Sequence, residues 1–331
     1  MLRRASLICV LALAACGGGA PTVTAPPLAP TGTLFVANAD GISVFPVTAS
    51  GNAAPQRQIT GLSAHTDGAG GGNTTGFSST TVRGLAPGST AGSVAALIVS
   101  VAHMQSPGSR IFEFSPTAIR PADARIIILL SGIDFGLNPA VGIASVPSRP
   151  GYDVLPGLFY VAKTDPPSAF RIASPSRAIA ADAAGNVYVS SDNPAQVAVY
   201  SPAATTGNAT PVRTIATASS PGPMAIGPDG TLYVVERANG FQVPSTIEEF
   251  APGASSPARV LGPFPADMSV VSIAVDNQNE LYVAQAQVDA NQVTTGPGTI
   301  AVFAPGASDA ATPVRSLQNP IQNMVSIAIG P

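Results

Sequence analysis

A short unit of two apolar strands joined by a polar turn recurs along the chain, and this repeat restricts the fold more than any other feature. Three copies are MAIGPDGTLYVV at residues 224–235, SIAVDNQNELYVA at 272–284 and AIAADAAGNVYVS at 178–190. Short β-branched and aromatic runs separated by Gly, Pro, Asn and Asp predict strands with tight turns. The sequence therefore predicts an all-β protein.

Two further strands follow each pair. IEEFAPGASSPARVLG begins at Ile247, and IAVFAPGASDAATPVRSLQ begins at Ile300. Tyr188, Tyr233 and Tyr282 recur at intervals of 45 and 49 residues, which is typical of the four-stranded blades of a β-propeller. We predict a six-bladed β-propeller, plus or minus one blade, over residues 31–331. The unit at 157–175 is irregular, and we expect it to lack its outer strand.

The two ends of the repeat region complement each other. The region starts with TGTLFVAN at residues 31–38, a second strand without a first, and stops with MVSIAIGP at 324–331, a first strand without a second. Joined, they reproduce the pattern of AIGPDGTLYVVE at residues 225–236. We predict that the N- and C-terminal strands pair and close the propeller, because closure removes exposed sheet edges.

The tripeptide YVA, followed by a polar residue and later by an I-x-V-F strand, resembles the NHL-repeat and gluconolactonase-like group of six-bladed propellers. The resemblance covers essentially all of residues 31–331. It implies the fold but no single activity, since enzymes, receptors and scaffolds share this architecture. It also implies that a lactonase-like member would hold one divalent cation at the channel mouth.

The first 30 residues are predicted to target the chain rather than to fold with it. Residues 1–15, MLRRASLICVLALAA, have two arginines before an apolar run that is too short to span a bilayer stably, as in a signal peptide. LAAC, ending at Cys16, resembles the bacterial lipobox, whose cysteine receives a diacylglycerol; an ordinary cleavage site that happens to precede Cys16 is the alternative. The lipidated Cys16 and a Gly/Pro-rich tether make up residues 16–30.

Composition restricts the partners. The formal charge is -3 and Lys163 is the single lysine, so no basic stripe is available for nucleic acid. The two cysteines are Cys9 and Cys16, which leaves the body without a disulfide or a cysteine-type zinc site.

We predict a monomer of the bacterial cell envelope, anchored by lipid to the outer membrane, with an envelope protein or a small molecule as partner.

One polar residue follows the second strand of each unit. We predict that these six residues form a ring around the channel mouth and line an asymmetric binding pocket. The alternative is that strand ends entering a turn generally carry polar residues. In NHL-like repeats this position is usually Asp, and here it is Asp in no unit. The predicted ring consists of Asn38, His103, Lys163, Ser191, Glu236 and Gln285.

A metal site is the second prediction for the channel mouth, and it follows from the resemblance. Glu236, Asn138, Asp192 and Asn193 would supply oxygen ligands for Ca²⁺ or another divalent cation. Exposed Asp and Asn residues are also common in turns that bind nothing. No spacing in the sequence tests this set, because its members would come from different blades. Apart from this cation, no cofactor is predicted.

An arginine recurs in the predicted outer strand of five units, at Arg57, Arg125, Arg213, Arg259 and Arg315. We expect its stem to cover apolar edge surface while its guanidinium bonds carbonyls of a neighbouring blade. A ring of anion-binding sites is the alternative.

These observations favour a lipid-anchored propeller that acts as a ligand- or protein-binding scaffold, with no catalytic activity evident. His65 and His103 are the only histidines, and no convergent set of Ser, His and Asp is recognisable. The alternative function is a divalent-metal-dependent, lactonase-like hydrolase or lyase at the channel mouth. A scaffold for outer-membrane assembly that works through its blade edges is a third hypothesis.

Overall fold

The computed structural model describes ten stretches of the chain, and all structural statements below refer to them: residues 31–38, 40–62, 80–100, 108–130, 140–146, 151–156, 160–164, 167–237, 244–288 and 294–331. Within these stretches the protein is all-β, and one 3₁₀ turn, η1 (Pro121–Asp123), is the only helical element. That turn is far too short to span a membrane, and no other helix is available there to do so. The predicted signal peptide, Cys16 and the tether lie outside the described residues.

The described strands form six four-stranded antiparallel sheets, and in each sheet the strands run in order from the axis to the periphery. Sheet 1 consists of β24 (Met324–Gly330), β1 (Thr33–Asn38), β2 (Gly41–Pro46) and β3 (Arg57–Thr60). Sheet 2 consists of β4 (Thr80–Pro87), β5 (Val94–Ser100), β6 (Gly108–Phe114) and β7 (Ala124–Leu130). Sheet 3 consists of β8 (Ala140–Ser145), β9 (Tyr152–Pro156), β10 (Tyr160–Thr164) and β11 (Pro167–Arg171).

The other three sheets follow the same order of strands. Sheet 4 consists of β12 (Ser176–Ala181), β13 (Val187–Asp192), β14 (Ala195–Tyr200) and β15 (Arg213–Ala216). Sheet 5 consists of β16 (Ser220–Ile226), β17 (Leu232–Arg237), β18 (Thr246–Phe250) and β19 (Arg259–Leu261). Sheet 6 consists of β20 (Ser269–Val275), β21 (Leu281–Val288), β22 (Thr294–Phe303) and β23 (Arg315–Gln322).

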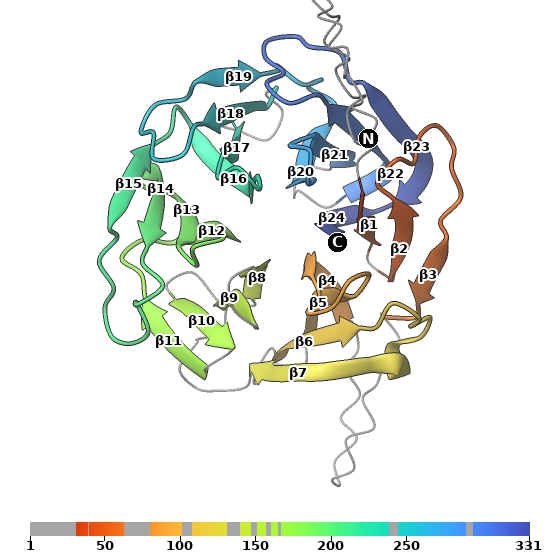
Figure 1. Ribbon diagram of the computed structural model, residues 1–331, viewed down its shortest axis with the longest axis horizontal. Helices are drawn as coiled ribbons and strands as arrows, with labels where there is room; N and C mark the ends of the chain where they lie inside the picture. The colour runs from red at the N-terminus through yellow and green to blue at the C-terminus, as the bar shows by residue number, and fades with distance from the viewer. Residues whose placement is uncertain are drawn as a thin grey trace, which may run out of the picture.

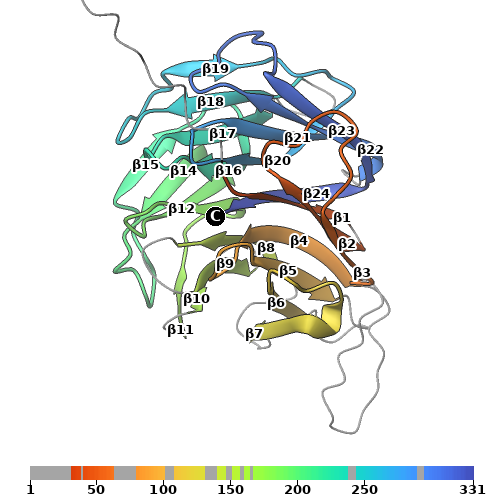
Figure 2. The same ribbon diagram turned by 45° about the vertical axis from the view of Figure 1, so that its right-hand side comes forward.

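The sheets are arranged around a central axis as the blades of a propeller (Figure 1). Their innermost strands contact one another in the order β4, β8, β12, β16, β20 and β24, and β24 contacts β4. Figure 2 shows the same sheets stacked face against face, with the fourth strands at the periphery. The prediction of an all-β propeller is therefore confirmed for the described residues.

A hydrophobic core lies between each pair of neighbouring sheets. Between sheets 4 and 5, for example, Tyr188 and Val199 pack against Met224 and Phe250. Alternate residues of a strand point to opposite faces, so every sheet supplies one apolar face to each neighbour. Because both faces are covered, the strands are nearly continuous apolar runs, which is why the repeat is so visible in the sequence.

The first and last described strands pair antiparallel in the register that the sequence motif predicts. Thr33 lies opposite Gly330, and Val36 lies opposite Ile327. The corresponding pair in sheet 5 joins Ile226 to Leu232 through the turn GPDG. In that turn Gly230 has a φ of 85°, a left-handed conformation that favours glycine, and Asp229 Oδ1 accepts the N–H of Thr231 at 3.0 Å.

The recurrent arginines of the fourth strands link neighbouring sheets at the periphery. Arg57 Nη1 donates to the carbonyl oxygen of Ser115 at 2.9 Å, and Arg213 Nη1 donates to that of Ala254 at 3.2 Å. Arg259 instead pairs with Glu249 on its own sheet at 2.5 Å. Arginines therefore bond carbonyls of the next sheet at some positions, as expected, and carboxylates of their own sheet at others.

Sheet 3 corrects two expectations. Its fourth strand, β11, is present, so the sheet does not lack its outer strand. The segment YVAK at residues 160–163, which resembles a second strand, belongs to the third strand β10, because β9 already pairs with both β8 and β10. Lys163 is therefore a residue of a third strand and does not follow the second one.

Candidate functional site

Every innermost strand contains a one-residue β-bulge at the same place. In sheet 2, Val82 lies opposite Ile98 and Gly84 lies opposite Leu97, so Arg83 is the additional residue. The registers of β8, β12, β16, β20 and β24 shift in the same way. A bulge redirects a side chain out of the regular alternation. The aligned bulge residues are Arg83, Val141, Arg177, Gly222, Val271 and Val325.

The residue after the bulge fastens neighbouring innermost strands to each other. Ser272 Oγ accepts the N–H of Ile327 on the next sheet at 3.1 Å, and Ser326 Oγ accepts the N–H of Leu85 at 3.2 Å. Gly142 occupies the same position in β8, where an added Cβ would come within 3.0 Å of Ile179 Cγ2. These small residues hold the inner strands close together and leave the bulge residues at the axis.

A cavity of 1120 Å³ lies at the axis and is lined by the bulged segments of the innermost strands. Two residues from the ends of second strands, Asp192 and Arg237, complete its polar wall. Prolines 175, 221 and 223 also line it, and proline offers no backbone N–H. These three residues therefore offer no backbone donor to a ligand.

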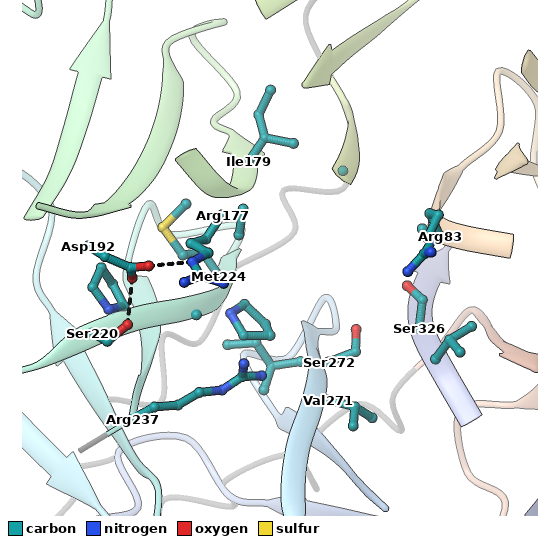
Figure 3. A pocket seen from close by; sticks show the side chains of 18 of the residues that line it. Arg83, Arg177, Ile179, Asp192, Ser220, Met224, Arg237, Val271, Ser272 and Ser326 are labelled. Atoms are coloured by element: carbon teal, nitrogen blue, oxygen red, sulfur yellow. Dashed lines mark hydrogen bonds and ion pairs between the residues drawn. The ribbon is translucent and has the colours of Figure 1, made fainter. Parts of the chain in front are cut away.

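Three arginines and one carboxylate are the charged residues among the described lining (Figure 3). Asp192 is bonded to Arg177 Nε and also accepts the hydroxyl of Ser220 at 2.5 Å. Arg83 lies across the cavity from Arg177 and Arg237 (Figure 3). The described lining therefore has an excess of positive charge.

Arg237 reaches the cavity although it belongs to a second strand. An added Cβ on Gly222, the bulge residue of β16, would come within 3.3 Å of Arg237 Nε, so the guanidinium covers the position that a bulge side chain would occupy. Its Nη2 donates to the carbonyl oxygen of Val270 on sheet 6 at 3.0 Å. Burial lowers the pKa of Arg237 from its ordinary value; the charge of Arg177 lowers it further, and Asp192 opposes this.

The predicted polar ring is only partly reproduced. Asn38, Ser191, Glu236 and Gln285 occupy equivalent positions, each opposite the residue before a bulge. In sheets 2 and 3, however, Ile98 and Pro156 hold this position. Lys163 lies on β10, and His103 lies outside the described residues. None of the four equivalent residues is among the described lining of the cavity; Asp192 and Arg237, each one residue further on, are.

Three of the predicted ring residues, Asn38, Ser191 and Lys163, make hydrogen bonds within the protein. Asn38 Oδ1 accepts the N–H of Gly41 at 2.7 Å, and Ser191 Oγ donates to the carbonyl oxygen of Pro194 at 2.9 Å. Gln285 is buried on β21. Lys163 is also buried, and its Nζ donates at 2.8 Å to the carbonyl oxygen of Pro202, in the loop between β14 and β15.

Glu236 lies between sheets 4 and 5 with a relative exposure of 3%. Its Oε2 accepts both the N–H and the hydroxyl of Ser219, at 2.9 and 3.0 Å. Burial raises the pKa of Glu236 to about 7; the N–H of Ser219 opposes the rise, and the carboxylate of Glu248 adds to it. Near neutral pH this carboxyl group is therefore partly protonated.

We expect the raised pKa of Glu236 to make the folded state less stable as the pH rises from about 4.5 to about 7. The folded protein holds this proton over that range and the unfolded chain does not, so stability is lost as the proton leaves. At pH 8 the variant Glu236→Gln should be more stable than the parent by up to about 3 kcal/mol, measured by urea unfolding at pH 5 and pH 8. Equal pH slopes for the two proteins would contradict the assignment.

The four predicted metal ligands are not brought together as a cation site by the described residues. Asp192 is bonded to Arg177 and Ser220, Asn193 is exposed in the turn after β13, and Glu236 is bonded to Ser219. Asn138 lies outside the described residues. Within the described stretches, no three His, Cys, Asp or Glu side chains are grouped so that they could hold a metal ion.

Arg83 and Arg177 were not among the site residues predicted from the sequence. The repeat itself contains the information needed to find them. When the first strands are aligned, one position is apolar in every copy, for example Met224, Ile273 and Ile327. Both arginines lie two residues before this position. A bulge is a feature of hydrogen-bond register, however, and the alternation of apolar residues does not reveal it.

Comparison with other proteins supports the fold. A protein of unknown function from Bacteroides caccae is 12% identical, with a TM-score of 0.56, and the match covers 91% of this chain and 99% of that one. A chain in the crystal structure of a nidogen/laminin complex is 14% identical, with a TM-score of 0.57, covering 90% and 98%. No protein-family model and no curated protein sequence matches the chain.

At identities this low, the two similarities concern the arrangement of the sheets alone. They extend over nine tenths of the chain, which supports a propeller that includes nearly all the described strands. Neither comparison bears on what the central cavity binds.

Proposed function

We propose that this protein is a lipid-anchored propeller of the bacterial cell envelope that binds a small-molecule ligand in its central cavity without transforming it. The cavity carries the proposal. Its volume, 1120 Å³, is close to that of sites for small ligands, and its wall combines a few polar groups with apolar residues such as Val271 and Val325.

The ring that forms this cavity is proposed to have six blades and to be of the NHL-like kind. Two observations support six blades: the six described sheets contact one another in cyclic order, and β24 pairs with β1. Pairing of the terminal strands would close the ring and make the inner wall continuous.

The anchor is proposed from the sequence. LAAC, ending at Cys16 after an apolar run, would direct lipid attachment, and the Gly/Pro-rich residues 17–30 would separate the propeller from the outer membrane. Replacement of Cys16 by Ser should abolish incorporation of labelled palmitate, and retention of the label would contradict the anchor.

A binding role is favoured over catalysis by the groups that face the cavity. Asp192 is the single carboxylate in the described lining, and Arg177 and Ser220 occupy it. Glu236, the carboxyl with the raised pKa, lies outside the lining and is bonded to Ser219. A general base must reach its substrate, and neither carboxyl is arranged to do so.

Thermal unfolding of the purified full-length chain against a panel of charged and uncharged small molecules tests the proposal. A ligand that binds only the native state raises Tm by mass action. Val325→Trp should abolish the rise, because the indole occupies the cavity. A rise that persists in this variant, or none with any compound, would contradict binding in the cavity. A rise caused by Ca²⁺ and lost in Glu236→Gln would instead favour the metal-dependent hydrolase.

A further inference from the structure

The six copies of the bulge provide an internal comparison for the cavity wall. The bulge forms with Val271 in β20, with Val325 in β24 and with Gly222 in β16. The fold therefore does not require a charged residue at this position. Arginine nevertheless occupies it in β4 and β12, as Arg83 and Arg177.

Arg177 and Arg237 bring two positive charges close together at the cavity wall. Arg177 and Arg237 are close enough for the charge of Arg177 to lower the pKa of Arg237. Asp192 is the one carboxylate in the described lining, and it is bonded to Arg177. An anion bound between these arginines would reduce the repulsion between their like charges.

The charges lie on two sides of the cavity wall, and the valines come from the sheets between them. Following the cyclic order of the sheets, Arg83, Arg177 and Arg237 come from sheets 2, 4 and 5, whereas Val271 and Val325 come from sheets 6 and 1. Figure 3 shows Arg83 on one side of the cavity and Arg177 and Arg237 on the other. A ligand with two separated anionic groups could contact both sides and rest its apolar part against the valines.

We propose that the central cavity binds a small organic dianion through Arg83 and the pair Arg177 and Arg237. Guanidinium groups bind carboxylates and phosphates through paired charge-assisted hydrogen bonds, so both kinds of oxyanion fit this chemistry. The proposal rests on the proposed ligand-binding function and specifies its ligand class. Asp192 keeps its bond to Ser220 when the anion binds, and it orients Arg177 toward the ligand.

Isothermal titration of the purified full-length chain tests this class of ligand with citrate, inorganic phosphate and the uncharged triethyl citrate. Citrate or phosphate should bind and triethyl citrate should not. Binding of citrate alone assigns carboxylates, and binding of phosphate alone assigns a phosphorylated ligand. Affinity should fall as salt is added, because the charges are partly open to solvent.

The double variant Arg83→Gln/Arg177→Gln should weaken binding about 100-fold, roughly tenfold for each lost charge-assisted bond. The matched control is Arg120→Gln/Arg125→Gln, which removes the same charge from exposed arginines in sheet 2, away from the cavity lining; it should change affinity less than twofold. Equal weakening in both double variants would overturn the proposal, because the anion would then respond only to net charge.

Two other outcomes separate this inference from the proposed function. In the first outcome, neither anion binds, but uncharged compounds raise Tm and Val325→Trp abolishes that rise. This result would exclude the dianion and would still support the proposal that the cavity binds a small molecule. If no compound of either kind binds, both proposals fail.

Discussion

Replacing Lys163 by methionine should destabilise the protein by about 3 to 5 kcal/mol, the usual cost of breaking a buried pair of charges. Lys163 has a relative exposure of 5% and lies directly opposite Asp153, whose exposure is 0%, across the pair β9–β10. Methionine preserves most of the volume but removes the ammonium group. Asp153 would then lie in the core without the cation that faces it, and either an unpaired carboxylate or its protonation has a cost.

The ammonium group makes further contacts that methionine cannot replace. Its Nζ donates to the carbonyl oxygen of Pro202 at 2.8 Å and lies 5.6 Å from the centre of the Phe170 ring. Pro202 lies in the loop between β14 and β15 of sheet 4, so the contact joins sheet 3 to that loop. Loss of a buried hydrogen bond from a charged donor adds to the cost, and we expect the midpoint of urea unfolding to fall accordingly.

The double variant Asp153→Leu/Lys163→Met is the control. Removing both charges eliminates the desolvation penalty, and replacement of buried pairs by apolar residues is often nearly neutral. The double variant should therefore recover most of the stability lost in Lys163→Met. A single variant that costs less than about 1 kcal/mol, or a double variant no more stable than the single one, would show that the two residues do not form a buried pair.

The same two residues explain why sheet 3 was misinterpreted from the sequence. Its second strand, YDVLP, contains a buried Asp153, and its third strand contains the buried Lys163. Charged residues inside strands interrupt the apolar pattern on which sequence-based assignment depends. YVAK, at residues 160–163, resembles the other second strands, so the sequence predicts a second strand where the structure has the third strand β10.

The rest of the propeller was predictable because local and global preferences agree there. Turn residues such as those of GPDG and the apolar runs on both sides define a hairpin without tertiary information. The pairing of residues 33–38 with 324–330 was also predictable, since the joined segments repeat the pattern found in sheet 5. The pairing of the terminal strands can be predicted because the sequence begins the repeat with a second strand and ends it with a first strand.

The cavity was less predictable than the sheets. Its charged wall depends on where one additional residue enters each innermost strand, and Arg237 lies over Gly222, where an added Cβ would come within 3.3 Å of its Nε. The polar residues after the second strands were visible in the sequence, but their side chains bond locally or lie between sheets. Which of two adjacent residues lines a cavity depends on strand register, which hydropathy alone leaves open.

Deleting residues 324–331 should prevent stable folding, because it removes the innermost strand β24 of sheet 1. Met324, Ile327 and Ala328 are buried in β24, and burial of a side chain such as Met or Ile contributes about 1.5 to 3 kcal/mol. The deletion also exposes β1 as an open edge and removes the strand that contacts both β20 and β4. Together these losses are comparable to the net stability of a domain, about 5 to 15 kcal/mol.

A circular permutant is the control for this deletion. It keeps β24 but moves the ends of the chain, so it shows whether folding requires the strand itself or the original position of the chain ends. Joining Pro331 to Thr31 creates IGPTGTL, which matches IGPDGTL of residues 226–232 in length and in every residue but one. New termini between Ala266 and Asp267, both exposed in the link from β19 to β20, leave each sheet built from one continuous segment. Circular dichroism should show a cooperative transition for this permutant and none for the deletion variant. Cooperative unfolding of the deletion variant near the parent Tm would show instead that β24 is dispensable, because the remaining strands would then be stable without it.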